Sequence, residues 1–356
     1  MDKKNLGVLF GGQSTEHDVS IVSGLSILKN LDKERFNIYP IYIDKDGNFF
    51  EYTDTLSHLD SLTVGDNLIN SEKLKEIDNI IGYLKKFDLL FPVLHGLYGE
   101  DGSIQGLFEL LKVPYVGCGI LSSSVGMDKA YTKIIFDRAQ INQAEYVYIR
   151  KYKHSYIYID EHFNETILDL PKIVDNICDK LQFPMFVKPS NSGSSVGITK
   201  AHNIKELSSA IEYAGKFDTK ILIENGINGR ELECAVLGNE EVIASCVGEI
   251  LSAEEFYSFD SKYKNSESKV VIPANLNSDI SDEIRTLAIK AFKSVDGKGL
   301  ARVDFFVENG TNKVFINEIN TMPGFTEISM YPKLFDNVGL HYKDLLNKII
   351  DLALEK

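Results

Sequence analysis

The sequence predicts an α/β protein whose C-terminal part is α+β. In the first third, strand patterns at 6–10 and 88–95 are each followed by a helical pattern, at 16–31 and 103–113. Such alternation of strands and helices indicates an open, mostly parallel sheet. From residue 220 onward, β-rich runs follow one another across turns, which is typical of antiparallel sheets. We therefore expect an open parallel N-terminal domain followed by units of a different topology.

Three units are predicted, covering residues 1–117, 118–225 and 226–356. The boundaries are drawn where the alternation of strands and helices changes. The second unit begins with one helix predicted over 122–139, and the third ends with an amphipathic helix predicted over 342–353.

The first unit is expected to contain a strand pair joined at Asp46 and Gly47, and a further strand at 114–118. Its polar segment 53–85 is predicted to be an insertion with one helix near 71–84. The strands expected in the last two units, apart from a C-terminal hairpin, lie at 145–151, 184–189, 198–201, 220–223, 230–238, 241–250 and 269–276. Asn203 and Glu206 have the spacing of a capping box, which predicts that a helix begins between them.

Composition and charge narrow the class of protein. The 356 residues are 44% hydrophobic and 25% charged, as in soluble globular proteins, and the net charge of −14 argues against a nucleic-acid-binding surface. The four cysteines form no C-x-x-C pair, which favours reduced thiols in the cytoplasm over a disulfide framework or a zinc site. There is no signal-peptide pattern and no run of about 18 apolar residues, so no membrane association is expected.

The segment 297–329 predicts a β-hairpin that leads into a loop. Asn309 and Gly310 are a strong hairpin signal, because both tolerate the positive φ of a type I′ turn. The flanking runs are rich in β-branched and aromatic residues. The side chains expected to face the core are Val303, Phe305, Ile319 and either Ile316 or Phe315.

Four polar side chains are expected on the other face of this hairpin. Because side chains alternate along a strand, Arg302 shares a face with Asp304, and Glu318 shares one with Asn320. Charged residues at this spacing are most often a solvated sheet face. Asp304, Glu318 and Asn320 nevertheless form a set of hard oxygen ligands of the kind that Mg²⁺ favours. Arg302 would then stabilise charge on a transferring phosphoryl group.

A Ser/Gly loop at 190–198 follows the strand that ends near Lys188. Its small residues would let backbone N–H groups wrap a phosphate. The lysine precedes the glycines, so this is not the Walker P-loop. Residues 193–197 have the letters of the G-x-S-x-G nucleophile elbow. An elbow requires a helix directly after the serine, however, and a strand is predicted there.

Three further polar residues stand in or beside loops, where their ordinary roles are structural. Glu16 lies in the first turn of a helix, His95 at a strand end, and Lys129 on a helix. The polar, aromatic-bearing segment 252–269 is of the kind that closes over a site.

Taken together and in this order, several of these segments resemble the D-alanine–D-alanine ligases of the ATP-grasp superfamily. They read GGQSTEHDVS, HGLYGEDGSIQG, GMDK, VKPSNSGSSVG, SKY, ARVDFF and NEINTMPGFTEIS. The resemblance covers nearly the whole chain and is weakest at 53–85 and 151–181. It implies a three-unit ATP-grasp architecture, with 252–269 as the closing loop. It also implies ATP-dependent formation of D-alanyl-D-alanine for peptidoglycan precursor synthesis in a cytoplasmic homodimer.

The resemblance also implies how ATP and metal are held between the second and third units. Relatives often carry a lysine and an aromatic residue where this chain has Asn225 and Gly226, which affects the contacts to the adenine. The metal ligands would be Asp304, Glu318 and Asn320, holding two Mg²⁺ or Mn²⁺ ions. The ATP-binding residues would be Lys129 and Lys188 at the phosphates, Ser195 in the covering loop, Glu231 at the ribose, and Glu224 and Ile227 at the adenine.

For the two D-alanine substrates, the resemblance assigns a second set of residues. The catalytic group would be Glu16, Ser194, Tyr263, Arg302 and the N–H of Gly324, and the substrate-binding group would be His95, Lys262 and Ser329. Glu16 would pair with the ammonium group of the first D-alanine. Ser194 and Tyr263 would link Glu16 to the closing loop.

Other functions compete with this interpretation. Related ligases join D-alanine to D-serine or D-lactate; Tyr263 favours an amino acid as second substrate but separates D-alanine from D-serine poorly. An oxidoreductase would need the G-x-G-x-x-G spacing, which GGQSTE lacks. A non-catalytic ATP-binding module is a third possibility, disfavoured because every expected charged group is present.

Overall fold

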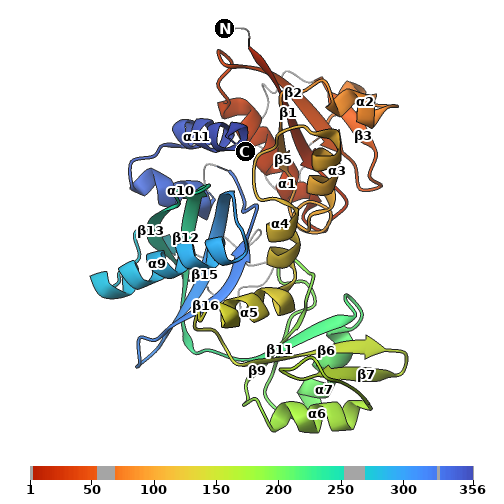
Figure 1. Ribbon diagram of the computed structural model, residues 1–356, viewed down its shortest axis with the longest axis vertical. Coiled ribbons are helices and arrows are strands. Elements are labelled where there is room, and N and C mark those ends of the chain that lie inside the picture. Colours follow the sequence, from red (N-terminus) through yellow and green to blue (C-terminus); the bar gives the residue numbers. More distant parts are fainter. Residues whose placement is uncertain (1–2, 54–68, 252–268, 327–328, 356) are drawn as a thin grey trace.

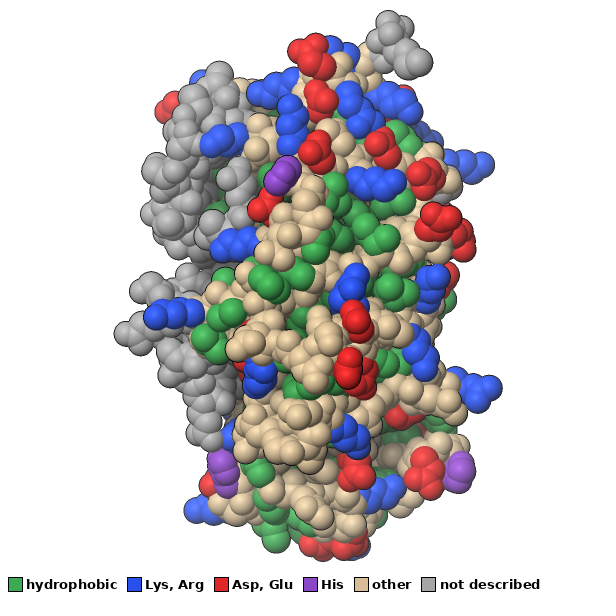
Figure 2. Space-filling view, turned by 90° about the vertical axis from the view of Figure 1, so that its left-hand side faces the viewer, with side chains coloured by type: hydrophobic (Ala, Val, Ile, Leu, Met, Phe, Trp, Pro, Cys, Tyr) green, Lys and Arg blue, Asp and Glu red, His purple; other side chains and the backbone are tan. Residues whose placement is uncertain are grey.

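The computed structural model describes residues 3–53, 69–251, 269–326 and 329–355. Within these residues the main strands form three sheets, which follow one another along the long axis of the molecule (Figure 1). Basic and acidic side chains are interspersed over the face shown in Figure 2. In the described part of the chain, no helix has the length and apolar character needed to span a membrane.

The first sheet joins a parallel part to an antiparallel edge. Its order is β4 (Leu74–Glu76), β3 (Phe49–Tyr52), β2 (Phe36–Ile43), β1 (Lys4–Gly11) and β5 (Leu89–Val93). β1 pairs in parallel with β2 and β5, while β2 and β3 are antiparallel across the predicted turn, where Gly47 has a φ of 89°. β4 lies in the segment predicted as an insertion. The strand expected at 114–118 is reduced to one bridge between Leu90 and Tyr115.

Helices follow the carboxyl ends of two of the parallel strands, as the strand–helix alternation predicts. α1 (His17–Asn30) follows β1, and α3 (Ser103–Leu111) follows β5. The predicted apolar side of α1 is buried against the sheet. In the insertion, the helix expected over 71–84 is a 3₁₀ turn at Ser71–Lys73, the strand β4 and a short α2 (Ile80–Leu84), so that prediction was wrong in length.

The second sheet is entirely antiparallel. Its order is β10 (Thr199–Ala201), β9 (Met185–Pro189), β11 (Lys220–Asn225), β6 (Tyr146–Tyr152), β7 (Ser155–Ile159) and β8 (Glu165–Leu168). One face packs on α6 (Leu170–Cys178) and α7 (Ile204–Ala214), and the other contacts α5 (Lys129–Arg138). The predicted cap of α7 is confirmed, because the Asn203 side chain accepts from the N–H of Glu206 and Glu206 accepts from the N–H of His202.

The helix predicted over 122–139 is broken at Asp128. The structure has α4 (Ile120–Met127) and α5, separated by Asp128 in an extended conformation with φ −88° and ψ 95°. The Asp128 carboxylate accepts from the N–H of Tyr131 and so caps α5. A run of residues with helical periodicity can contain such an internal cap without losing its pattern.

The third sheet is also antiparallel. Its order is β14 (Lys269–Val271), β13 (Ile243–Leu251), β12 (Gly229–Gly238), β15 (Gly299–Glu308) and β16 (Val314–Asn320). α9 (Ser278–Ser294) covers one face, and α10 (Met330–Asn337) and α11 (Tyr342–Leu354) lie on the other (Figure 1). The last strand of the second sheet ends at Asn225, next to the predicted boundary at 225, although the extents of the three units remain a prediction.

The C-terminal hairpin forms as predicted but turns differently. β15 and β16 are joined by a five-residue loop instead of a two-residue type I′ turn, with positive φ at Gly310 (85°) and Asn312 (57°). The N–H of Asn312 donates to the carbonyl of Glu308. The N–H of Glu308 in turn donates to the carbonyl of Lys313, and this hydrogen bond closes the loop. The sequence left open whether Ile316 or Phe315 faces the core, and in the structure Ile316 is the buried residue.

The first and third parts of the chain share one hydrophobic core. Leu6 of β1 and Leu25 of α1 belong to the same buried cluster as Leu346 and Ile349 of α11. These C-terminal helices therefore fill the space between the first and third sheets and fix their relative position (Figure 1).

Candidate functional site

A cavity of about 630 Å³ opens between the second and third sheets. Side chains from β9 and β11 line one wall, and side chains from β12, β15 and β16 line the other. Among its lining residues are several that the sequence predicts to bind ATP or metal, namely Lys188, Ser195, Glu224, Ile227, Glu231, Asp304 and Glu318.

Strand alternation explains why Lys188 and Glu224 point into this cavity. Val187 and Ile223 face the core beneath α6 and α7, so their neighbours Lys188 and Glu224 must face the opposite side. These two side chains form an ion pair, and Lys188 Nζ lies 3.4 Å from Asn317 Oδ1.

A second lysine completes this buried group. Lys133 Nζ lies 3.0 Å from Glu224 Oε2, and its side chain is only 4% exposed. Burial acts to raise the pKa of Glu224, but the charges of Lys133 and Lys188 outweigh it and lower the pKa to about 2. Burial and the charge of Lys188 lower the pKa of Lys133, despite the attraction of Glu224. Two lysines therefore meet one carboxylate in the wall of the cavity.

Lys133 and Asn317 are not among the site residues predicted from the sequence. Lys133 lies four residues after Lys129 on α5, a spacing that places both on one face of the helix and could have indicated it. Asn317 faces the cavity because a register shift follows the pairing of Asp304 with Glu318, and a shift of this kind leaves no simple trace in the sequence.

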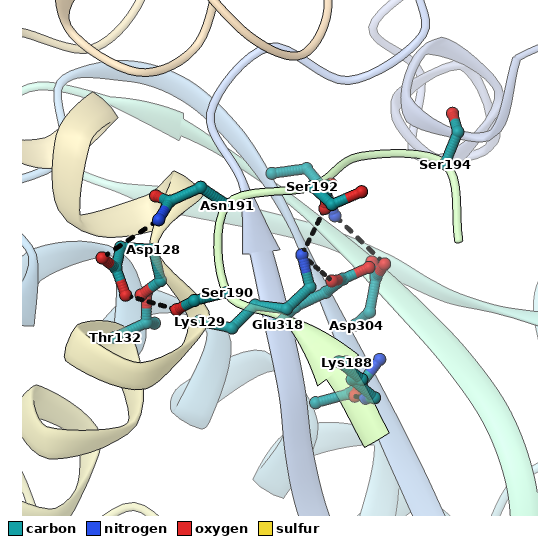
Figure 3. Close-up of polar contacts among 12 residues, drawn as sticks. Asp128, Lys129, Thr132, Lys188, Ser190, Asn191, Ser192, Ser194, Asp304 and Glu318 are labelled. Carbon is teal, nitrogen blue, oxygen red and sulfur yellow. Dashed lines mark hydrogen bonds and ion pairs between the residues drawn. The ribbon is translucent and has the colours of Figure 1, made fainter. Parts of the chain in front are cut away.

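The Ser/Gly loop joins β9 to β10, so the nucleophile elbow is excluded. Ser194 and Ser195 both adopt positive φ, 48° and 61°, and the chain continues into a strand. The loop begins beside Lys129, whose Nζ donates to the carbonyl of Ser192 at 2.7 Å and lies 3.7 Å from Glu318 Oε2 (Figure 3). Lys129 thus connects α5, the Ser/Gly loop and the hairpin.

The four polar side chains of the hairpin lie together as the sequence predicts. Arg302 is paired with Asn320 across the strands, and Asp304 with Glu318. Asn320 Nδ2 donates to Asp304 Oδ2 at 3.1 Å. Their neighbours Val303 and Ile319 are buried in the core beneath α9.

These residues fit a hard divalent cation. The described residues contain no group of three His, Cys, Asp or Glu side chains arranged for a metal. Mg²⁺, however, is commonly held by one or two carboxylates together with waters and substrate phosphates. Asp304 and Glu318 supply two carboxylates, the Asn320 amide can supply an oxygen, and the adjoining cavity has room for phosphates.

Arg302 contacts one of the predicted metal ligands, Asp304. Its Nε and Nη2 donate to the two carboxylate oxygens of Asp304 at 2.7 and 2.6 Å, and its Nε lies 3.1 Å from Glu233 Oε2. Burial opposes the charge on Arg302, yet the two acidic neighbours raise its pKa well above the usual value. The guanidinium is therefore charged and held rigidly beside the predicted metal ligands.

A second cluster lies where the loops after β1 and β5 meet the Ser/Gly loop. The Ser194 hydroxyl donates to Glu16 Oε1, and Glu16 is only 8% exposed. Ser14 Oγ donates to the carbonyl of His95 at 2.6 Å, which joins the two strand-end loops. The structure thus brings Glu16, Ser194 and His95 into one region from two different units.

His95 and Glu100 hold the loop that follows the hairpin. His95 Nδ1–H donates to the carbonyl of Met322 at 2.9 Å, and the N–H of Met322 donates to Glu100 Oε1 at 3.0 Å. Burial lowers the pKa of His95, so its ring is neutral at pH 7. Gly324 follows in this loop, and the Ser329 hydroxyl contacts Thr326, 2.7 Å away. Glu100 was not predicted, although it lies within HGLYGEDG.

Two predicted residues, Lys262 and Tyr263, lie outside the described residues, as does nearly all of the predicted closing loop. For the other predicted residues the structure gives a position, and their roles remain proposals.

Comparison with known proteins identifies the chain's relatives. Residues 5–118 match the family model described as "D-ala D-ala ligase N-terminus", and residues 135–351 match "D-ala D-ala ligase C-terminus". A protein of Acetivibrio thermocellus named D-alanine–D-alanine ligase is 48% identical, with 100% of this chain and 97% of the relative covered. One of the same name from Clostridium novyi is 46% identical, with 99% of each chain covered.

Solved structures agree in fold. The VanG D-Ala:D-Ser ligase from Enterococcus faecalis has a TM-score of 0.85 at 34% identity, covering 99% of this chain and 100% of that one. The D-alanine-D-alanine ligase from Coxiella burnetii has a TM-score of 0.82 at 33% identity, covering 100% of this chain and 95% of that one.

Proposed function

The chain belongs to the D-alanine–D-alanine ligase family, and on this premise we propose that it joins two D-alanine molecules into D-alanyl-D-alanine while ATP is converted to ADP and phosphate. Its fold is the ATP-grasp fold of its structural neighbours. One observation carries the proposal. Arg302, Asp304, Glu318 and Asn320 share one hairpin face, and this face borders a cavity that also receives Lys188.

In the first half-reaction, a carboxylate oxygen of one D-alanine attacks the γ-phosphorus of ATP, the bond to the β-phosphate oxygen breaks, and ADP leaves. Lys129 and Lys188 would contact the phosphates, supported by their place at the start of the Ser/Gly loop and in the cavity wall. Glu231 would contact the ribose, and 224–227 the adenine. Ser195 would cover the phosphates, and Arg302 would stabilise the charge on the transferring group.

In the second half-reaction, the amine of the other D-alanine attacks the acyl carbon, loses a proton, and phosphate leaves. Arg302 and the N–H of Gly324 would stabilise the tetrahedral oxyanion. Glu16 would hold the ammonium group of the first D-alanine, supported by its burial and by the Ser194 contact. His95 would assist near the first substrate. Ser329 and Lys262 would fix the second, and Tyr263 would link Ser194 to the closing loop.

The divalent cations of this chemistry would be Mg²⁺ or Mn²⁺, two per site, held by Asp304, Glu318 and Asn320. When bound, they neutralise charge on the phosphate oxygens. Their support here is the oxygen-donor set on one hairpin face.

D-Serine as the second substrate is the alternative, represented among the structural neighbours by the D-Ala:D-Ser ligase. The relatives at higher identity are named D-alanine–D-alanine ligase, which favours D-alanine.

We further propose a cytoplasmic homodimer that supplies peptidoglycan precursor synthesis. The four free cysteines are compatible with a reducing compartment, and the dimer rests on family resemblance.

The test is phosphate release by the purified chain with Mg-ATP and D-alanine, with product masses recorded. We expect release matched by D-alanyl-D-alanine and abolished by a chelator of divalent cations. Product only after addition of D-serine or D-lactate would overturn the substrate assignment. ATP binding without phosphate release on any D-amino acid would indicate a non-catalytic module instead.

A further inference from the structure

Asp128, between α4 and α5, is the centre of a polar network beside the start of the Ser/Gly loop (Figure 3). Its Oδ1 accepts from the N–H of Tyr131 at 3.2 Å and from the Ser190 hydroxyl at 2.6 Å. Its Oδ2 is paired with Lys220 and lies 3.5 Å from Asn191 Nδ2. One carboxylate therefore joins α5, β11 and the start of the Ser/Gly loop.

The first turn of α5 is fastened to residues 190–192 by three further contacts. The N–H of Lys129 donates to the carbonyl of Ser190 at 3.1 Å, and the N–H of Ala130 donates to the Ser190 hydroxyl at 3.1 Å. Lys129 Nζ donates to the carbonyl of Ser192 at 2.7 Å. The loop cannot shift relative to Lys129 without breaking several hydrogen bonds together.

The network is sheltered from water. Ser190 is fully buried, and the side chains of Asp128 and Lys220 are only 13% and 18% exposed. Lys220 Nζ also lies 4.3 Å from the centre of the Tyr131 ring. In such surroundings a carboxylate that accepts several hydrogen bonds holds its partners in a defined geometry.

We propose that Asp128 is a positioning residue for the phosphate groups of ATP. It acts through Lys129 and the Ser/Gly loop, since the lining of the cavity includes neither Asp128 nor Ser190 nor Lys220. By holding α5 against residues 190–192, it sets both the Lys129 ammonium and the loop N–H groups at the distance that a polyphosphate requires. This inference rests on the proposed ATP-binding function.

The experiment compares Asp128→Ala and Asp128→Asn with the control Asp169→Ala. Asp169 caps α6 in the same part of the chain, where its carboxylate accepts from the N–H of Lys172 at 3.2 Å. The Asp169→Ala substitution therefore also removes a helix cap, but it leaves the contacts of Asp128 to Ser190 and Lys220 in place. For each full-length protein, the affinities for ATP and AMP are measured together with KM for ATP and KM for D-alanine.

We expect Asp128→Ala to weaken ATP binding and to raise KM for ATP about tenfold or more, as for the loss of a charge-assisted hydrogen bond. AMP affinity and KM for D-alanine should change less than about twofold, because AMP lacks the β- and γ-phosphates and D-alanine carries no phosphate. Asp128→Asn keeps an acceptor for Tyr131 and Ser190 but loses the charge facing Lys220, and should show a smaller change in the same direction. Asp169→Ala should leave all four values near wild type.

Two results would overturn the inference. One is a folded Asp128→Ala or Asp128→Asn protein whose KM for ATP equals that of Asp169→Ala. The other is a uniform loss of ATP, AMP and D-alanine affinities, which would indicate a general structural role. Because each comparison is made against wild type, a failure of the proposed function would be evident separately, as a lack of ATP binding by the wild-type protein.

Discussion

Glu100 lies between two loops of the candidate site, and its environment changes the chemistry of its carboxyl group. Its carboxylate accepts from the N–H of Gly96 at 2.6 Å and from the N–H of Met322 at 3.0 Å, which ties the loop after β5 to the loop after the hairpin. Burial and the nearby charge of Glu16 raise its pKa to about 8. Glu100 therefore retains its proton in the folded protein at pH values where the unfolded chain has lost it.

This shift predicts a pH dependence of stability. The folded pKa of Glu100 lies above the unfolded value, so its contribution is complete below about pH 4.5 and is lost as the pH rises toward 8. The free energy of unfolding of the wild type should fall from pH 5.5 to pH 8 relative to Glu100→Gln, by at most about 1.4 kcal/mol per pH unit. Urea titrations of both proteins at the two pH values measure this; parallel pH profiles would contradict the prediction.

Arg302 is expected to act on turnover more than on nucleotide binding. Replacing it with alanine removes the donor that we propose stabilises the transferring phosphoryl group and the oxyanion, and kcat should fall about 10²- to 10³-fold, as when an oxyanion donor is lost. ATP should still bind, because Lys188 and the lining of the cavity remain. Steady-state kinetics and calorimetric titration with ATP test this, with the more exposed Arg285→Ala on α9 as the control. Turnover near the wild-type rate would refute the assigned role.

At the scale of elements, the Ser/Gly loop lies against Glu16, the residue directly before α1. A Cβ added at Gly193 would lie 2.4 Å from Glu16 Oε2, so the carboxylate would have to move away from Ser194. The steric clash would be with the end of the Glu16 side chain and not with backbone atoms. An added Cβ at Gly193 should therefore disturb the contact between Glu16 and Ser194 without unfolding the loop.

Gly193→Ala is therefore predicted to raise KM for D-alanine by about tenfold, equivalent to ~1.4 kcal/mol, while the melting temperature stays close to that of the wild type. The control is Gly106→Ala on α3, where an added Cβ has no atom within 4 Å. Kinetics with varied D-alanine and a thermal melt of each variant separate the two effects. An unchanged KM for D-alanine in Gly193→Ala would show that the Glu16 contact does not serve the substrate.

At the scale of the whole molecule, α11 holds the first and third parts together. Ile349 is fully buried in a core that includes β1 and α1. Ile349→Ala should lower the free energy of unfolding by about 2–5 kcal/mol, the range for a deleted core side chain. In urea unfolding, signals from the first sheet and from the C-terminal helices should shift together; a shift in the C-terminal signal alone would contradict the shared core.

Much of the fold follows from the sequence because its signals are local. The apolar spacing of α1, the Asn203 cap and the alternation along β15 each depend on a few neighbouring residues, and each is confirmed. The break at Asp128 and the loop at 309–313 were missed for a physical reason. The conformations there are decided by hydrogen bonds to distant or competing partners, such as Ser190 for Asp128.

The candidate site also has one part that follows from the local sequence and another that depends on tertiary contacts. The sequence by itself determined which residue types were available and that Arg302, Asp304, Glu318 and Asn320 share one face, because strand alternation is a property of the backbone. Only the tertiary structure brought Lys133 onto Glu224, Asp128 onto Ser190 and Glu100 onto Met322. These partners are separated by 62 to 222 residues. Their encounter depends on how three sheets pack, and no short segment of sequence carries that information.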